Sequence, residues 1–314
     1  MKDHESSASP RLAVITGAVT GIGASLAELL AAQGWRLVLL NRSAERTAPL
    51  LERLKDIGGS ASCEVIETDL ADHAALQDSA LQIAGRYGAV DALFNNAGVL
   101  REDLVISSMG NEMHFEINTV APYLLTHVLR KALKSAARSS GRAVVVTPST
   151  SAIKSTKHFD IENLRKGTRG GLFGAYAQSK LAWAVLNAHL AESFDQDGIE
   201  LFAVDPGVNR TGMTAGTGAP LPVRLLWRLL PKPAMGAKRL TAVLGDEWRG
   251  RSGALVMGGK ARPIPADGMN DQQVSKLLAT MRESIPQADG YPGLIDRNND
   301  DREHSSSDAK EDKL

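Results

Sequence analysis

Tyr176 and Lys180 are four residues apart at the start of an alanine- and leucine-rich stretch. On a helix, side chains at this spacing point to one face, about one turn apart. An ammonium group beside a phenol favours the phenolate, which lowers a tyrosine pKa from about 10 toward the working range of a general acid or base. Taken alone, these two residues are best interpreted as a surface pair on an amphipathic helix. The motifs elsewhere in the chain have to show whether they belong to an active site instead.

A glycine-rich segment, Thr16 to Gly23, provides the first of these motifs. Gly17, Gly21 and Gly23 lie between an apolar strand-like run and a helical pattern that ends at Gly34. Glycine permits a tight turn and a close approach of the backbone, and the free N–H groups of a helix N-terminus attract an anion. The segment therefore predicts a site for a dinucleotide pyrophosphate, and we expect Thr20 and Ile22 to line it with the three glycines.

The second strand-like run ends in Asn41 and Arg42. An acidic residue at this place usually binds the ribose hydroxyls of NAD, whereas an arginine accommodates the additional phosphate of NADP. Asn41 removes the carboxylate that would repel this phosphate, and Arg42 supplies positive charge. The sequence therefore favours NADP (NADPH) over NAD.

Polar and glycine residues follow the next two strand-like runs. Asp69 and Leu70 close the third run, and the segment 95–98 (Asn-Asn-Ala-Gly) closes the fourth. Such residues are common in turns, but at successive strand ends they can also wall an adenine pocket. We expect Asp69, Leu70, Asn96, Ala97 and Gly98 to contact the cofactor.

Short apolar runs alternate with longer helical patterns as far as about residue 257. This rhythm predicts an α/β fold, a doubly wound parallel sheet of about seven strands with helices on both faces. No linker interrupts it, so we expect one domain over 11–295, a flexible segment over 1–10 and a disordered charged tail over 296–314. The expected strands are Leu12–Ile15, Arg36–Leu40, Cys63–Glu67, Ala92–Asn95, Ala143–Thr147, Leu201–Asp205 and Gly253–Met257.

Composition excludes several other classes of protein. The 36 basic and 36 acidic residues cancel, so no overall charge favours nucleic acid. A single cysteine, Cys63, and seven scattered histidines predict neither an internal disulfide nor a metal site. The polar first ten residues do not resemble a signal peptide, and no apolar run is long enough for a membrane span. We expect a cytoplasmic protein.

Taken together, these motifs resemble the short-chain dehydrogenase/reductase family over roughly residues 11–260. Further matches are Asn118 and the segment Pro206-Gly207 followed by Thr211. The long insert before Tyr176 and the segment 253–265 are most similar to the retinol-dehydrogenase-like branch. The resemblance implies a Rossmann-type fold and a hydride transfer between a nicotinamide cofactor and a carbonyl or alcohol.

The resemblance also implies a role for each matching residue. Tyr176 would exchange a proton with the substrate oxygen, and Lys180 would hold the nicotinamide ribose and lower the tyrosine pKa. Asn118 would position a water molecule in a proton relay to Lys180. Pro206 and Gly207 would flank the nicotinamide, and Thr211 would bind its carboxamide.

One position departs from the family pattern. Members usually carry two serines after the fifth strand, and the second polarises the substrate oxygen. Pro148 stands at this place and has no hydroxyl group. Ser149 is the nearest replacement and our first candidate, Ser151 is the second, and Thr147 and Thr150 remain open.

Two long segments, 152–175 and 211–235, are predicted to be substrate-side loops because they follow strands at the carboxyl edge of the sheet. The apolar residues of 211–235 favour a lid over a hydrophobic small molecule or, alternatively, simple packing on the protein; a role at a membrane surface is a weaker reading. A homodimer and a monomer are both compatible with the sequence. The alternative function is a catalytically impaired NADP-binding regulatory or scaffold protein, suggested by Pro148 and opposed by the retention of Asn118, Tyr176 and Lys180.

Overall fold

A computed structural model describes residues 10–57, 62–156, 159–167, 174–215, 227–265 and 270–285. One eight-stranded sheet with the order β3-β2-β1-β4-β5-β6-β7-β8 runs through these residues. Neighbouring strands from β3 to β7 are parallel, and only β8 pairs antiparallel, with β7. The strands are β1 Leu12–Thr16, β2 Arg36–Asn41, β3 Cys63–Glu67, β4 Ala92–Phe94, β5 Ala143–Pro148, β6 Ile199–Val204, β7 Leu255–Met257 and β8 Lys260–Arg262.

The seven expected strands are all present, and β8 adds one that the sequence analysis did not predict. Its three side chains are exposed, so β8 shows no alternation of apolar and polar residues. Gly258 and Gly259 form the two-residue turn before it, with φ values of 61° and 73°. Two consecutive residues with positive φ are typical of a tight hairpin, and this Gly-Gly pair is the signal that could have predicted β8.

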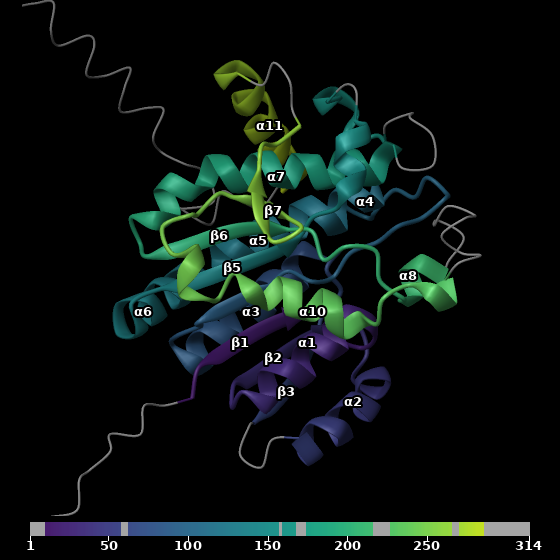
Figure 1. Cartoon of the computed structure of the whole chain (residues 1–314). Helices are drawn as coiled ribbons and strands as arrows, with labels where there is room; N and C mark the ends of the chain where they lie inside the picture. Colours follow the sequence, from purple (N-terminus) through teal and green to yellow (C-terminus); the bar gives the residue numbers. More distant parts are fainter. Residues whose placement is uncertain are drawn as a thin grey trace, which may run out of the picture.

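Helices cover both faces of the sheet, as predicted (Figure 1). Helices α1, α2 and α10 pack on one face, and α3, α5, α6 and α7 pack on the other. The helices are α1 Gly21–Ala32, α2 Ala44–Ile57, α3 His73–Tyr87, α4 Met113–Phe115, α5 Ala121–Val128, α6 Arg130–Ser140, α7 Gly174–Asp195, α8 Gly212–Ala215, α10 Pro233–Ala242 and α11 Asp271–Ser284. Shorter helical turns are η1 Glu116–Val120, η2 Ser151–Ser155, η3 Ile161–Asn163, η5 Trp227–Leu229 and η6 Asp246–Trp248.

The apolar strands supply two separate cores because successive side chains of a strand point to opposite faces. In β1, Leu12 and Val14 pack in the core beneath α3, α5 and α7, whereas Ala13 and Ile15 pack in the core beneath α1 and α10. A parallel sheet buried on both faces needs such continuous apolar strands.

The strand order reverses at β1, which pairs with β2 on one side and with β4 on the other. From this switch point the chain continues outward in opposite directions, and a crevice opens at the carboxyl ends of the strands. The glycine-rich segment follows β1 at this point.

Both predicted substrate-side loops are described only in part. Segment 152–175 contains η3 and most of η2, and segment 211–235 contains α8, η5 and the start of α10. The lid prediction depended on six apolar residues of 211–235, and three of them, Leu221, Leu225 and Leu226, lie outside the described residues. The segments 1–9 and 286–314, with the predictions made for the two ends of the chain, also lie outside them.

Candidate active site

The turn after β1 has the geometry of an anion cradle. Gly17 and Gly21 have φ values of 68° and 63°, a region that favours glycine. At Gly23 a Cβ atom would collide with the carbonyl oxygen of Gly17 and the amide of Asn96. Helix α1 begins at Gly21 without a side-chain cap from Thr20, so its first N–H groups remain available. The residues present therefore fit a bound pyrophosphate.

Two asparagines hold this turn in place. The Asn96 amide donates hydrogen bonds to the carbonyl oxygens of Thr16 and Gly17, at 3.0 and 3.1 Å. The Asn41 side-chain oxygen accepts a hydrogen bond from the Ala18 N–H at 2.8 Å, and Asn41 is 3% exposed. The sequence analysis singled out Asn41 because its side chain carries no charge. The structure shows a second role, since this side chain holds the glycine-rich turn in place.

A cavity of about 450 Å³ lies at the carboxyl ends of β1, β2, β3 and β4. It brings together the residues that the sequence assigned to the pyrophosphate, ribose and adenine, namely Gly17, Thr20, Gly21, Ile22, Gly23, Asn41, Arg42, Asp69, Leu70, Asn96, Ala97 and Gly98. Thr211, which was assigned to the nicotinamide carboxamide, also lines it.

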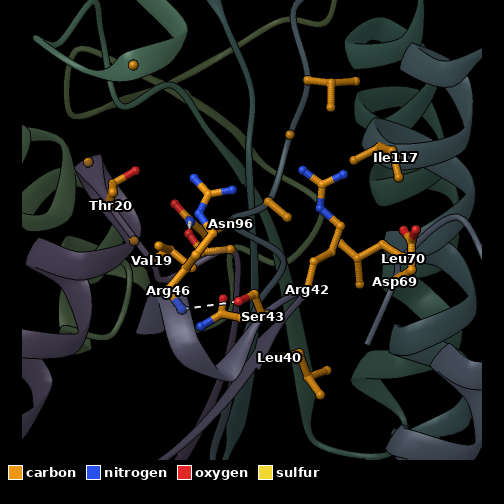
Figure 2. A pocket seen from close by; sticks show the side chains of 18 of the residues that line it. Val19, Thr20, Leu40, Arg42, Ser43, Arg46, Asp69, Leu70, Asn96 and Ile117 are labelled. Carbon is orange, nitrogen blue, oxygen red and sulfur yellow. Dashed lines mark hydrogen bonds between the residues drawn. The ribbon is translucent and has the colours of Figure 1, made fainter. Parts of the chain in front are cut away.

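The same cavity contains a second arginine that the sequence analysis missed. Arg42, Ser43 and Arg46 all line it, and Figure 2 draws Ser43 between the two arginines, with Asp69 and Leu70 beyond Arg42. The Ser43 hydroxyl accepts a hydrogen bond from the Arg46 N–H at 3.1 Å, which caps the start of α2. Arg46 follows Arg42 by four residues, and this spacing across a strand–helix junction is the signal that could have found it.

A second cavity, of about 520 Å³, adjoins the first. The two share Ile22, Asn96, Gly98 and Thr211, so they are parts of one crevice. Of the remaining predicted residues, Ser149, Tyr176, Lys180, Pro206 and Gly207 line this second part, whereas Asn118 lines neither cavity. The structure thus places the Tyr176 helix and the glycine-rich turn on one continuous site.

Lys180 is a buried cation. It is 4% exposed, and its Nζ atom donates a hydrogen bond to the Pro148 carbonyl oxygen at 2.8 Å. Removal from water disfavours the charged form, and burial lowers the pKa of Lys180 to about 8. This lysine therefore titrates close to neutral pH.

Tyr176 departs from the expectation that Lys180 lowers its pKa. In the polypeptide alone, burial and, to a smaller extent, the Asp205 carboxylate raise the pKa of Tyr176 to about 12. A hydrogen bond with the Thr150 side chain acts in the opposite direction, whereas Lys180 is not among the causes. The expectation was wrong for the protein alone because desolvation of the phenolate outweighs the helical neighbour. The sequence could not reveal the depth of burial.

Asn118 lies in η1, a π-helical turn, a rare element that is frequent at functional sites. Its side chain accepts a hydrogen bond from the Val99 N–H at 3.0 Å and donates to the Ser179 hydroxyl at 3.1 Å. Within the described part of the chain it makes no hydrogen bond to Lys180. The proton relay through Asn118 stays a prediction.

Pro148 ends β5 and lines the second cavity, so the wall lacks a hydroxyl at the expected place. Ser149 is 4% exposed, and its Oγ atom has no hydrogen-bond partner among the described residues. The Thr147 hydroxyl accepts a hydrogen bond from Asn95. Ser151 and Thr150 line the cavity, together with Lys154 and Asp205, which the sequence analysis did not single out.

Asp205 is partly buried at the end of β6, where its carboxylate accepts a hydrogen bond from the Gly207 N–H at 2.7 Å. Burial raises the pKa of Asp205, while that hydrogen bond, Arg239 and Lys154 oppose the rise. In the described ranges, no group of three His, Cys, Asp or Glu side chains is arranged to bind a metal ion. None of the described helices is both long and apolar enough to cross a membrane.

Known proteins that are similar to this chain indicate the family to which this site belongs. The family model for short chain dehydrogenases matches residues 11–161. Retinol dehydrogenase 13 from Homo sapiens is 30% identical over 277 residues, which cover 84% of this chain and 81% of that protein. The chain belongs to the short-chain dehydrogenase/reductase family. Polyprenol dehydrogenase from Homo sapiens is 29% identical, over 88% of this chain and 82% of its own length.

These relatives place this short-chain dehydrogenase/reductase in the retinol-dehydrogenase-like branch, as its motifs predicted, and identify it as an oxidoreductase. Solved structures show the same fold. The RhlG/NADP complex of Pseudomonas aeruginosa has a TM-score of 0.64 at 23% identity, covering 79% of this chain and 95% of that one. A 3-ketoacyl-(acyl-carrier-protein) reductase from Brucella melitensis complexed with NADH has a TM-score of 0.60 at 19% identity, covering 78% and 95%.

Proposed function

We propose that this protein is an NADP-dependent oxidoreductase that transfers a hydride between the nicotinamide and the carbonyl or alcohol of a hydrophobic small molecule. One observation carries the proposal. Tyr176 and Lys180 line a cavity that shares four residues with the cavity of the glycine-rich turn. A proton donor and a dinucleotide cradle in one crevice are what hydride transfer to a carbonyl requires.

The roles follow from the positions of the side chains. When bound, the nicotinamide supplies or accepts the hydride. The Tyr176 phenol donates its proton to the substrate oxygen during reduction, and its high pKa keeps it protonated before the reaction. Lys180 places a positive charge in the same cavity, where it holds the ribose of the nicotinamide half when the cofactor is bound. Asn118 holds Ser179, the neighbour of Lys180, through a hydrogen bond.

The preference for NADP rests on Arg42 and Arg46. Both side chains line the cavity beside β2 and α2, where the ribose of the adenosine half would lie. Guanidinium groups bind phosphate through charge-assisted hydrogen bonds. The solved structures named above include one complex with NADP and one with NADH, so the fold alone does not select the cofactor.

The hydrophobic substrate is supported by the second cavity and by the relatives. Ile22, Leu100 and Val208 line this cavity, and Val208 is also exposed. Retinol and polyprenol, the compounds in the names of the related dehydrogenases, are apolar alcohols. An alcohol or ketone with an apolar body fits such a wall.

The test is turnover by the purified protein. NADPH or NADH is mixed with a panel of short- and long-chain aldehydes and ketones, and the loss of reduced-nicotinamide absorbance is followed. We expect oxidation of NADPH with a long-chain carbonyl, and its loss in Tyr176→Phe with NADPH binding retained. Tight NADPH binding without oxidation across the panel would support the regulatory or scaffold alternative instead.

A further inference from the structure

Tyr176 lies in the first turn of α7 and lines the second cavity. The first turn of a helix is the part that intrahelical hydrogen bonds hold least, so the direction of a side chain there depends on what packs against it. His114 of α4 is such a neighbour. The two ring centroids are 6.2 Å apart and the ring planes meet at 70°, the edge-to-face arrangement that aromatic pairs prefer.

Both nitrogen atoms of the His114 imidazole are bound. The Nε2 atom accepts a hydrogen bond from the Arg101 N–H at 2.9 Å. A ring nitrogen that accepts an N–H carries no hydrogen of its own, so the hydrogen of the neutral ring lies on Nδ1. Nδ1 donates it to the Glu112 Oε1 atom at 2.7 Å. These two hydrogen bonds fix the tautomer and the rotation of the ring, because a turned ring would lose both.

Glu112 is itself held in place. It is 1% exposed, and its Oε2 atom accepts hydrogen bonds from the N–H groups of His114 and Phe115, at 2.9 and 3.1 Å, as the N-cap of α4. The Glu112 N–H donates to the Arg165 carbonyl oxygen at 2.7 Å. His114 is 4% exposed. The imidazole is therefore a fixed support, and a functional side chain is held best by neighbours whose own conformations are locked.

The same imidazole is connected to the cofactor side of the crevice. Arg101, whose N–H it binds, lines the first cavity, and Leu100 lines the second. Both residues belong to the segment after β4, which begins with the predicted cofactor residues 95–98. One side chain thus joins the ring of the proton donor to the wall of the cofactor cavity.

We propose that His114 is a positioning residue, which holds the Tyr176 ring at the wall of the second cavity and ties it to the Arg101 segment beside the cofactor. The inference rests on the proposed function of Tyr176 as the general acid. His114 takes no part in the proton transfer, because both of its nitrogen atoms are already bound. Its contribution is orientation, and a misplacement of about 1 Å at a reacting group can cost about 100-fold in rate.

Two variants separate the ring of His114 from its hydrogen bonds. His114→Gln removes the ring but can still present an acceptor oxygen to the Arg101 N–H. His114→Phe keeps a ring beside Tyr176 but removes both hydrogen bonds and leaves the buried Glu112 carboxylate without its imidazole donor. If the ring contact positions Tyr176, the second variant is the more active and the less stable.

His127→Ala is the matched control. The His127 imidazole also packs on a tyrosine, Tyr123, with ring centroids 4.1 Å apart, and it lines neither cavity. This variant removes an imidazole–tyrosine contact of the same kind at a distance from the crevice. We expect it to leave kcat unchanged.

The contact is measured without turnover by NMR of protein with ¹³C-labelled tyrosine rings. The Tyr176 resonances are assigned by their absence in Tyr176→Phe. We expect them to move in His114→Gln, which removes the ring current of the imidazole, and to stay in place in His127→Ala.

Steady-state kinetics, the NADPH Kd and Tm are measured on the same proteins. We expect kcat for carbonyl reduction to fall about 10-fold in His114→Gln and to stay within about 3-fold of the wild type in His114→Phe. The NADPH Kd should be nearly unchanged in both. His114→Phe should have the lower Tm, because a buried carboxylate has lost its donor. A merely structural role would make kcat follow Tm instead.

Tyr176 resonances that stay in place in His114→Gln would overturn the inference. A kcat that is lower in His114→Phe than in His114→Gln, in parallel with Tm, would also overturn it. If the wild-type protein showed no turnover while its Tyr176 resonances responded to His114→Gln, the proposed function would be wrong and the support of the Tyr176 ring by His114 would stand.

Discussion

The ammonium group of Lys180 donates a hydrogen bond to the carbonyl oxygen of Pro148, at 2.8 Å, from a position that is 4% exposed. This single acceptor does not offset the loss of water, so the pKa of Lys180 falls to about 8. The lysine and the proline thus link the end of β5 to the Tyr176 helix through a cation that titrates near neutral pH.

We expect this buried lysine to make stability depend on pH. Its pKa is about 8 in the folded chain and 10.5 in an exposed lysine. Between these values the unfolded chain binds more protons, so the free energy of unfolding rises with pH, by up to about 3 kcal/mol. Urea denaturation of the wild type and Lys180→Met from pH 7 to 10 checks this. A rise of equal size in both proteins would contradict it.

The same pKa predicts the pH dependence of carbonyl reduction. Reduction needs the protonated phenol of Tyr176, whose pKa of about 12 keeps it protonated, and the charged form of Lys180. We therefore expect kcat/KM, which reports the free enzyme, to decrease as pH rises through about 8. The profile is measured with NADPH from pH 6 to 10, and a constant value up to pH 10 would argue against a required ammonium.

Arg42 and Arg46 are expected to set the cofactor preference. Removal of both charges in Arg42→Ala/Arg46→Ala should weaken NADPH binding about 10- to 100-fold and leave NADH binding nearly unchanged. Fluorescence titration measures both dissociation constants. Arg53→Ala is the matched control, because Arg53 also lies on α2 but pairs with Glu28. Equal losses for NADPH and NADH would refute the assignment of these two arginines.

Gly23 should tolerate no side chain. A Cβ atom there would collide with the Gly17 carbonyl oxygen and the Asn96 amide, both of which shape the cofactor turn. Gly23→Ala is expected to lower Tm and to weaken NADPH binding. Gly85→Ala is the control: Gly85 lies in α3 with no atom within 4 Å of its Cβ position. Because alanine favours a helix, Tm should rise in this variant. Similar Tm changes in both variants would contradict the steric argument.

Glu116 begins the π-helical turn of Asn118 and is fully buried. Its carboxylate accepts hydrogen bonds from Ser107 and from Asn111, both at 2.8 Å, and contacts His73. Glu116→Ala would leave these polar groups without their acceptor, so we expect a loss of about 3–5 kcal/mol in the free energy of unfolding.

Urea denaturation measures this loss, and Glu162→Ala serves as the control. Glu162 forms an exposed ion pair with Lys276 of α11, so its removal should leave stability within error of the wild type. If Glu116→Ala were as stable as Glu162→Ala, the buried network would have no structural importance.

The sequence by itself determined the parts of this protein that depend on local chemistry. The alternation of apolar runs and helical patterns predicted seven of the eight strands, because burial on both faces demands continuous apolar strands. Gly17, Gly21 and Gly23 predicted the cofactor turn, since positive φ and close approach leave glycine as the residue that fits. The spacing of Tyr176 and Lys180 predicted that both point to one face of a helix.

Only the tertiary structure decided how these groups behave. Whether the pKa of Tyr176 falls or rises depends on how much water the fold removes, and the identities of its neighbours along the helix do not specify this. Counting along the chain favoured Ser149, and the folded chain brings both Ser149 and Thr150 to the cavity of Tyr176. Burial and side-chain direction are set by elements far apart in sequence, which is why they emerge only when the chain is folded.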